Sequence, residues 1–141
     1  LQIAHVLISQ LSSGDSNTRI QARVSRLWDF HDLSDDTEVK HTDLVLLDKM
    51  GNSIHAQMYH PAIEKLKPLL QEGKVYYIES FTVRYANRTY RPVAHNLMIL
   101  FTKWTTLEEC IDVPADFPDI TFSLTRIEEV PSLVDKNLFY V

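Results

Sequence analysis

The stretch SIHAQMYHPAIEKLKPLLQEG, residues 53–73, changes its hydrophobic period in the middle. Residues 53–59 alternate apolar and polar side chains, which is typical of a half-buried strand. From Pro61 onward the apolar residues recur at helical spacing until Gly73 ends the segment. Pro68 should kink or shorten this helix, because proline removes a backbone donor. The stretch therefore predicts a strand that is followed directly by a short helix.

Strand patterns flank this stretch on both sides. Two strands are predicted before it and two after it, at residues 18–28, 42–48, within 75–93, and at 96–101. Five strands with a helix between the third and the fourth favour a small closed barrel of the OB type, which shields its edges by curling the sheet onto itself. The expected fold class is therefore all-β, a five-stranded OB-fold barrel with a short helix between strands 3 and 4, plus a C-terminal extension.

Length and composition fit one domain with its own core. The chain has 141 residues, of which 45% are hydrophobic. We expect the barrel to occupy residues 1–112 and the extension to occupy 113–141. The single cysteine, Cys110, excludes an internal disulfide and a multi-cysteine zinc site, and it favours a reducing compartment. No apolar run is long enough to predict a membrane span.

Charge is distributed unevenly along the chain, whose net charge is −5. Acidic residues gather in two segments, 29–43 and 108–135. The segment 74–103 between them is basic, and its core is VYYIESFTVRYANRTYRPV, residues 75–93, which contains four tyrosines and three arginines. The acidic total therefore hides a basic, aromatic patch.

A hairpin is predicted within this patch. A turn at residues 86–88 would place Arg84 opposite Tyr90, on one face of the hairpin. Val83 and Tyr85 would then point into the barrel.

The neighbouring strand supplies further polar side chains. His55, Gln57 and Tyr59 share one side of the strand at 53–59, and they would line a groove with Arg84 and Tyr90. Such a groove suits single-stranded nucleic acid, because rings stack on bases at about 1–3 kcal/mol per base and guanidinium groups follow the phosphates. An ordinary half-exposed strand is the alternative interpretation of the same residues.

Other candidate sites are weaker. Trp28 and Phe30 could form a second stacking patch, but Trp28 has the parity of the core residues and is expected to pack inside unless a bulge reverses the phase. The six histidines lack metal-ligand spacing, and no nucleophile motif or phosphate-binding glycine loop is present. We therefore expect no metal, no cofactor and no catalytic residues.

The segments LLDKMGNSIHAQMYHPAIEKLKPLL and GKVYYIESFTVRYANRTYRPV resemble the first major single-stranded-DNA-binding OB domain of the replication protein A large (70 kDa) subunit, in particular its plant and transposon-borne forms. RIQARVSRLW and DFPDITFSLTRIEEV also fit, so the resemblance covers nearly the whole chain. It implies that the extension leads into a following OB domain. It also implies a nuclear role in DNA replication, recombination and repair, together with other replication protein A subunits or domains through the rest of the parent chain.

The resemblance further assigns roles to residues. Tyr59 and Tyr90 would stack on bases, Arg84 would contact phosphate, and His55 would take the place of a basic residue. The full set of expected nucleic-acid-binding residues is Tyr59, Tyr90, Arg84, Arg88, His55, Gln57 and Arg91.

Two departures from the family pattern bear on affinity. The segment 29–43, an expected loop over the groove, is rich in aspartate, and Met98 replaces an acidic residue on the last strand. The acidic loop and tail leave open an alternative function, a protein-interaction OB module that docks a basic partner. The sequence does not decide between DNA and RNA, since stacking accepts both.

Overall fold

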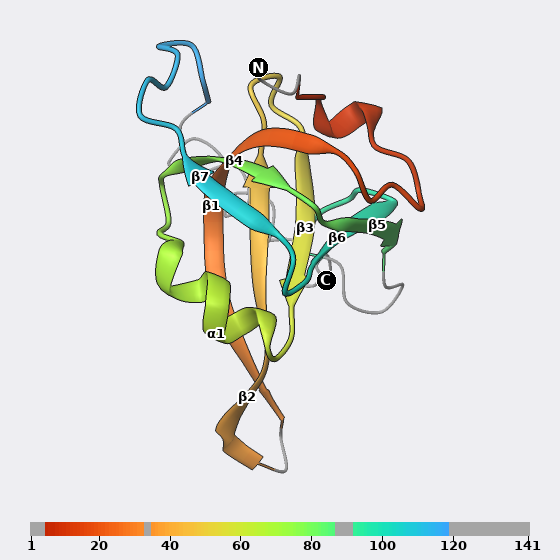
Figure 1. Ribbon diagram of the computed structural model, residues 1–141, viewed down its shortest axis with the longest axis vertical. Helices are drawn as coiled ribbons and strands as arrows, with labels where there is room; N and C mark the ends of the chain where they lie inside the picture. Colours follow the sequence, from red (N-terminus) through yellow and green to blue (C-terminus); the bar gives the residue numbers. More distant parts are fainter. Residues whose placement is uncertain (1–4, 33–34, 87–91, 119–141) are drawn as a thin grey trace, which may run out of the picture.

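The computed structural model describes residues 5–32, 35–86 and 92–118, which form a curled seven-stranded sheet with short helices (Figure 1). Along the chain the elements are η1 (Ile8–Gln10), β1 (Arg19–Asp32), β2 (Asp35–Leu47), β3 (Ser53–Met58), α1 (Ala62–Leu66), η2 (Lys67–Leu69), β4 (Val75–Glu79), β5 (Thr82–Tyr85), β6 (Leu97–Phe101) and β7 (Thr106–Glu109). The strand order is β5-β6-β3-β2-β1-β4-β7. The all-β OB-type class is confirmed, whereas the count of five strands is wrong.

The additional strands have two origins. The predicted fourth strand is divided at Ser80, whose φ of 64° bends the chain, so β4 pairs with β1 while β5 pairs with β6. Ser80 and Phe81 thus connect the two sides of the curled sheet within one continuous segment. The second addition is β7, which pairs with β4.

The hydrophobic core lies inside the curled sheet. Registered pairs such as Leu44–Ala56 and Leu46–Ile54 point inward from β2 and β3. The predicted inner face of the third strand is confirmed, because Ile54, Ala56 and Met58 are all fully buried. A strand period of two therefore positions the opposite side chains of β3, residues 55 and 57, on the outside of the barrel.

The acidic segment 29–43 is not a loop. The β1–β2 pairing continues to Asp32–Asp35, while β3 pairs only with residues 42–47 of β2. Residues 29–32 and 35–41 therefore form a two-stranded arm, called the β-arm below, which projects from the barrel (Figure 1).

The helix forms where the sequence predicts it and is short for the predicted reason. α1 ends at Leu66 and continues as the 3-10 turn η2, which contains Pro68. The buried side of α1 is formed by Ala62, Ile63 and Leu66. Among the described residues, none of the helices has the length and apolar character that a membrane crossing requires.

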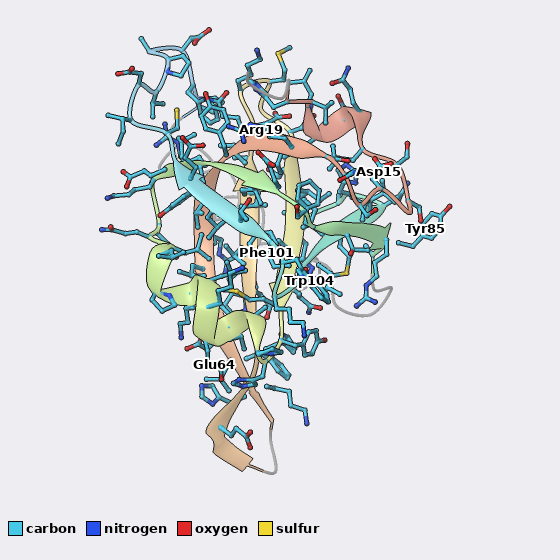
Figure 2. All side chains as sticks on the ribbon, in the orientation of Figure 1. Asp15, Arg19, Glu64, Tyr85, Phe101 and Trp104 are labelled. Carbon is cyan, nitrogen blue, oxygen red and sulfur yellow. The ribbon has the colours of Figure 1, made fainter. Side chains whose placement is uncertain are left out.

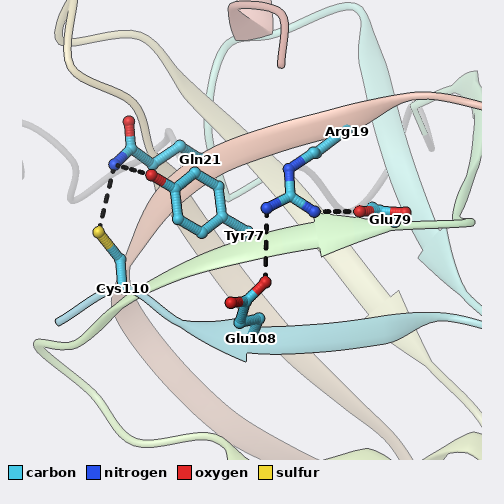
Figure 3. Close-up of polar contacts among 6 residues, drawn as sticks. All are labelled: Arg19, Gln21, Tyr77, Glu79, Glu108 and Cys110. Atoms are coloured by element: carbon cyan, nitrogen blue, oxygen red, sulfur yellow. Dashed lines mark hydrogen bonds and ion pairs between the residues drawn. The ribbon is translucent and has the colours of Figure 1, made fainter. Parts of the chain in front are cut away.

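A polar network fastens β7 to the barrel (Figure 3). Arg19 pairs with Glu79 and, at 3.5 Å, with Glu108, and its guanidinium carbon lies 4.4 Å from the centroid of the Tyr77 ring. Cys110 is buried beside this network, as expected of a small apolar residue, and its Sγ lies 3.4 Å from Nε2 of Gln21. Phe117 packs with Cys110 and Val75 in a small second cluster, so the packed chain continues past residue 112.

Candidate nucleic-acid interface

A bulge at Ser25 decides which side chains of β1 reach the outside of the barrel. The β1–β2 register shifts between Val24 and Arg26, so that one residue has no partner. Val24 is in the core, and after the bulge Leu27 is the residue that packs against it. Trp28 is therefore on the outside. The expectation that Trp28 packs in the core is wrong, because the bulge at Ser25 reverses the alternation of inward and outward side chains along β1.

Registered partners form two rows across the outer face, by which we mean the sides of β1, β2, β3, β6 and β5 that point away from the core. The first row is Arg26, Val45, His55, Met98 and Arg84, and the second is Trp28, Asp43, Gln57, Leu100 and Thr82. Three of the predicted site residues, His55, Gln57 and Arg84, therefore share one face, although they come from two separate strands. Arg84 is exposed, whereas His55 and Gln57 are buried.

Three rings lie side by side at the base of the β-arm. Phe30 and His41 stack in parallel with their centroids 4.6 Å apart, and the His41 and Tyr59 centroids are 5.3 Å apart in a tilted arrangement. His41 is buried between them, while Phe30 is 40% and Tyr59 42% exposed. The hydroxyl of Tyr59 lies 3.4 Å from Oε1 of Gln57, to which it donates. Two exposed aromatic rings are therefore held on the outer face by a buried imidazole.

The ring of Trp28 stacks on the imidazole of a second buried histidine, His55. The two rings are nearly parallel, at an interplanar angle of 7° and a centroid distance of 6.5 Å. The guanidinium carbon of Arg26 lies 4.7 Å from the Trp28 ring centroid, a cation–π distance. His55 is 1% exposed, so it is poorly placed to contact phosphate directly, and its role in binding stays a prediction.

A single carboxylate joins the two imidazoles. Oδ1 of Asp43 lies 2.7 Å from Nε2 of His55, and Oδ2 lies 2.7 Å from Nδ1 of His41. The contact with His41 is close but lies off the hydrogen-bonding direction. Within the part of the chain that the structure describes, no group of histidine, cysteine, aspartate and glutamate side chains could hold a metal ion.

The acidic residues at the base of the β-arm are paired. Asp29 accepts hydrogen bonds from Nζ of Lys67 at 2.5 Å and from the hydroxyl of Thr42 at 2.8 Å. Burial alone would raise the pKa of Asp29, but the bonds from Lys67 and Thr42 outweigh it and lower the pKa. Asp29 and Asp43 thus already have partners, which weakens the expected repulsion of phosphate by this segment.

His60 connects the β-arm to the helix. Its Nε2 lies 3.0 Å from the carbonyl oxygen of Val39, and its Nδ1 contacts the carboxylate of Glu64. Both ring nitrogens face acceptors, so the doubly protonated ring fits best. The bond to the Val39 carbonyl, followed by that to Glu64, raises the pKa of His60.

The predicted pairing of Arg84 with Tyr90 involves a residue outside the described part of the chain and stays a prediction. On its β6 side Arg84 pairs with Met98, and the ladder between β5 and β6 continues to a bond from Ala86 N to Asn96 O. The chain between these strands is consequently a long connection. Tyr90, Arg88 and Arg91 lie outside the described residues.

Tyr85 differs from the expectation. It does not point into the barrel but is 73% exposed and projects outward from the end of β5 (Figure 2).

Some residues of the outer face were missed or undervalued from the sequence. Arg26 and Phe30 belong to it, as does the buried Asp43. The available signal is the spacing of Val24 and Leu27, three residues apart where alternation would give two, which indicates a bulge. Asp43 gave no comparable signal, because it stood at the junction of the acidic segment 29–43 and the predicted strand 42–48.

Comparison with known proteins places this geometry in a family. Residues 9–131 match the family described as "Domain of unknown function DUF223". The replication protein A 70 kDa DNA-binding subunit of Xenopus tropicalis is 28% identical over 128 residues, which are 90% of this chain and 21% of that protein. One form of this subunit in Arabidopsis thaliana is 29% identical over 92 residues, 65% of this chain and 15% of that protein. The chain thus spans about a fifth of the length of these relatives, or less.

Solved structures give the same result. A replication protein A heterotrimer bound to single-stranded DNA contains a similar domain, with a TM-score of 0.70 and 30% identity over 81% of this chain and 26% of that one. DNA-binding domain A of Saccharomyces cerevisiae replication protein A matches with a TM-score of 0.57 and 29% identity, covering 78% of this chain and 96% of that one. The chain therefore belongs to the DUF223 family and is an OB domain of the replication protein A large-subunit type.

Proposed function

We propose that this domain binds single-stranded DNA on its outer face with little dependence on sequence. The observation that carries the proposal is the group Phe30, His41 and Tyr59, which presents two exposed rings on the same face as a row that ends in Arg84. Rings of this kind stack on unpaired bases, which all have a π-face, while cations follow the backbone. A duplex would not expose its base faces to such a surface.

The residues divide into rings and cations. Phe30 and Tyr59 supply stacking, and Arg84 and Arg26 supply positive charge at the two ends of one row. Gln57 orients Tyr59 through the bond to its hydroxyl. Tyr90, Arg88 and Arg91 remain proposed contributors on the basis of the family resemblance.

The wider role rests on the relatives. Their names describe DNA-binding subunits of replication protein A, and one solved relative is a heterotrimer bound to single-stranded DNA. We propose that this chain, as part of a longer protein, acts with other replication protein A subunits or domains in the nucleus, in replication, recombination and repair. In that role it is a binding module and not an enzyme.

Titration of labelled oligothymidine at low salt tests the proposal. Tyr59→Ala and Phe30→Ala should each weaken binding by about five- to a hundredfold, since stacking contributes about 1–3 kcal/mol per base. Tyr85→Ala is the matched control. Its ring is more exposed than either, but it follows Arg84 on β5 and so points away from the Arg84 face.

The wild-type result decides between the two candidate functions. Measurable binding that both variants weaken and Tyr85→Ala leaves unchanged supports the proposal. No binding at high micromolar protein would reject it and would favour the protein-interaction module.

A further inference from the structure

We propose that Asp43 is a positioning residue for nucleic-acid binding, because its buried carboxylate fixes the two imidazoles that support the stacking rings. The inference rests on the proposed function and deepens it. It assigns a role to an acidic residue in a surface that should attract a polyanion, where an acid would otherwise be unfavourable.

Burial shows that Asp43 is not an ordinary surface acid. It is 0% exposed, and in the strand register it lies between Trp28 on β1 and Gln57 on β3. A buried carboxylate is destabilising unless its charge is compensated by partners. Oδ1 of Asp43 is hydrogen-bonded to Nε2 of His55 at 2.7 Å, and Oδ2 lies 2.7 Å from Nδ1 of His41 in a close polar contact that is off the hydrogen-bonding direction.

Each imidazole in turn supports aromatic rings of the interface. His55 lies parallel to Trp28, and His41 lies parallel to Phe30 and against Tyr59. The two imidazoles come from different strands, β2 and β3, and Asp43 is the group that contacts both. A single carboxylate therefore sets the positions of three rings on the outer face.

Asp43 would affect affinity by holding the stacking rings in place before DNA binds, and not by contacting the DNA itself. A ring that is already fixed loses less conformational entropy when a base stacks on it. Asp43 itself is sealed from solvent and does not reach the nucleic acid. Its loss should therefore reduce affinity without changing the number of phosphate contacts.

The sign of the effect separates this proposal from simple electrostatics. Asp43→Asn removes a negative charge from beneath a DNA-binding face, so long-range electrostatics alone would make binding tighter. Positioning predicts the opposite result, a loss of affinity for oligothymidine of about three- to tenfold. The log–log salt slope should stay at the wild-type value, because no cation is removed.

Asp48→Asn is the matched control. Asp48 is also buried on the β2 side, at 1% exposure, but it accepts bonds from the backbone of Ile8, Met50 and Asn52 and contacts none of the rings. Both variants are compared with wild type at a temperature where circular dichroism shows them folded. Asp48→Asn should bind oligothymidine as wild type does.

Two further measurements link Asp43 to the rings. In a Phe30→Ala background, Asp43→Asn should cost less affinity than in wild type, because part of what it positions is gone. In a Trp104→Phe background Trp28 is the remaining tryptophan, and its fluorescence should change with Asp43→Asn but not with Asp48→Asn. If Asp43→Asn does not fold, His41→Leu serves as the second variant, since it removes one imidazole and leaves Asp43 paired with His55.

The outcomes are distinct. Weaker binding by Asp43→Asn, with an unchanged salt slope and a smaller effect without Phe30, supports the inference. The inference is overturned if Tyr59→Ala weakens binding but Asp43→Asn binds as tightly as wild type or tighter. It is also overturned if Asp48→Asn loses as much affinity as Asp43→Asn does. If wild type does not bind, or Tyr59→Ala and Phe30→Ala have no effect, the proposed function itself has failed.

Discussion

Arg84 and Arg26 stand at the two ends of one row of registered side chains, with His55 near the middle. Because Arg84 is exposed on the face of the stacking rings, it is the clearest candidate for a phosphate contact. Arg84→Ala should weaken oligothymidine binding and reduce the magnitude of the log–log salt slope by about 0.7, the contribution of one contact on a single strand. Titrations at several salt concentrations measure both quantities.

Lys74→Ala controls for the loss of one positive charge. Lys74 pairs with Glu109 at 3.3 Å where β4 meets β7, away from the rings. If the log–log salt slope of Arg84→Ala equals that of wild type, Arg84 does not contact phosphate.

Single residues explain how far the site could be predicted. Alternation along 53–59 correctly placed His55, Gln57 and Tyr59 on one side, because period two is a property of the strand itself. The pairing of Arg84 with Met98 was not predicted, because only a tight turn within 75–93 was considered as the source of a partner strand. A strand's own period is local information, whereas its partner is set by the whole fold.

At the scale of elements, the bend at Ser80 allows one segment to serve both sides of the sheet. Its φ of 64° is in the left-handed region, which costs a non-glycine residue about 1 kcal/mol or more. Ser80→Gly should therefore leave the free energy of unfolding unchanged or raise it by up to about 1 kcal/mol, and Ser80→Val should lower it by roughly 1–3 kcal/mol. Urea unfolding measures these changes.

Ser53→Gly, at the start of β3, is the control, because it should change the free energy of unfolding in the direction opposite to Ser80→Gly. Its backbone is in an ordinary strand, so glycine there should lower the free energy of unfolding by roughly 0.5–1 kcal/mol. If both glycine variants lose stability equally, the bend at Ser80 carries no strain.

The contact between the β-arm and α1 should depend on pH through His60. Its pKa is raised above 6.5 in the folded state, first by the Val39 carbonyl and then by Glu64. The stabilisation is therefore complete below pH 6.5 and is lost as the pH rises through the raised pKa. The difference in Tm between wild type and His60→Ala should be largest near pH 6 and should shrink toward pH 8.5.

His95→Ala gives a control of opposite direction. Burial lowers the pKa of His95, so protonation there destabilises the fold and its contribution improves as the pH rises. A Tm difference for His60→Ala that is constant across this range would show that His60 does not join the arm to the helix through its charge.

At the scale of the whole molecule, basic residues lie on the outer face of an acidic chain, and two of the nearest acids are paired. The net charge is −5, yet Arg26 and Arg84 lie on the outer face while Asp29 and Asp43 are paired within the structure. Composition predicted a basic patch on an acidic chain, and the fold shows that two of the acids nearest this patch have partners. Most of that pairing could not be predicted, since Lys67 lies in η2 and His55 on β3, whereas His41 is two residues from Asp43 on the same strand.

The boundary of the folded unit is a property of the whole molecule that truncation can test. Phe117 is buried against Val75 and Cys110, on the side of the barrel where β4 and β7 pair. A chain that ends after Asp112 should be about 1–3 kcal/mol less stable to unfolding than a chain that ends after Pro118, because burial of an aromatic side chain such as Phe117 contributes about that much. Phe117→Ala in the chain that ends after Pro118 should reproduce the loss. Urea unfolding measures stability and oligothymidine titration measures function, which should be equal in all folded forms because Phe117 is remote from the rings. Equal stability of the two truncated chains would instead place the end of the folded unit at residue 112.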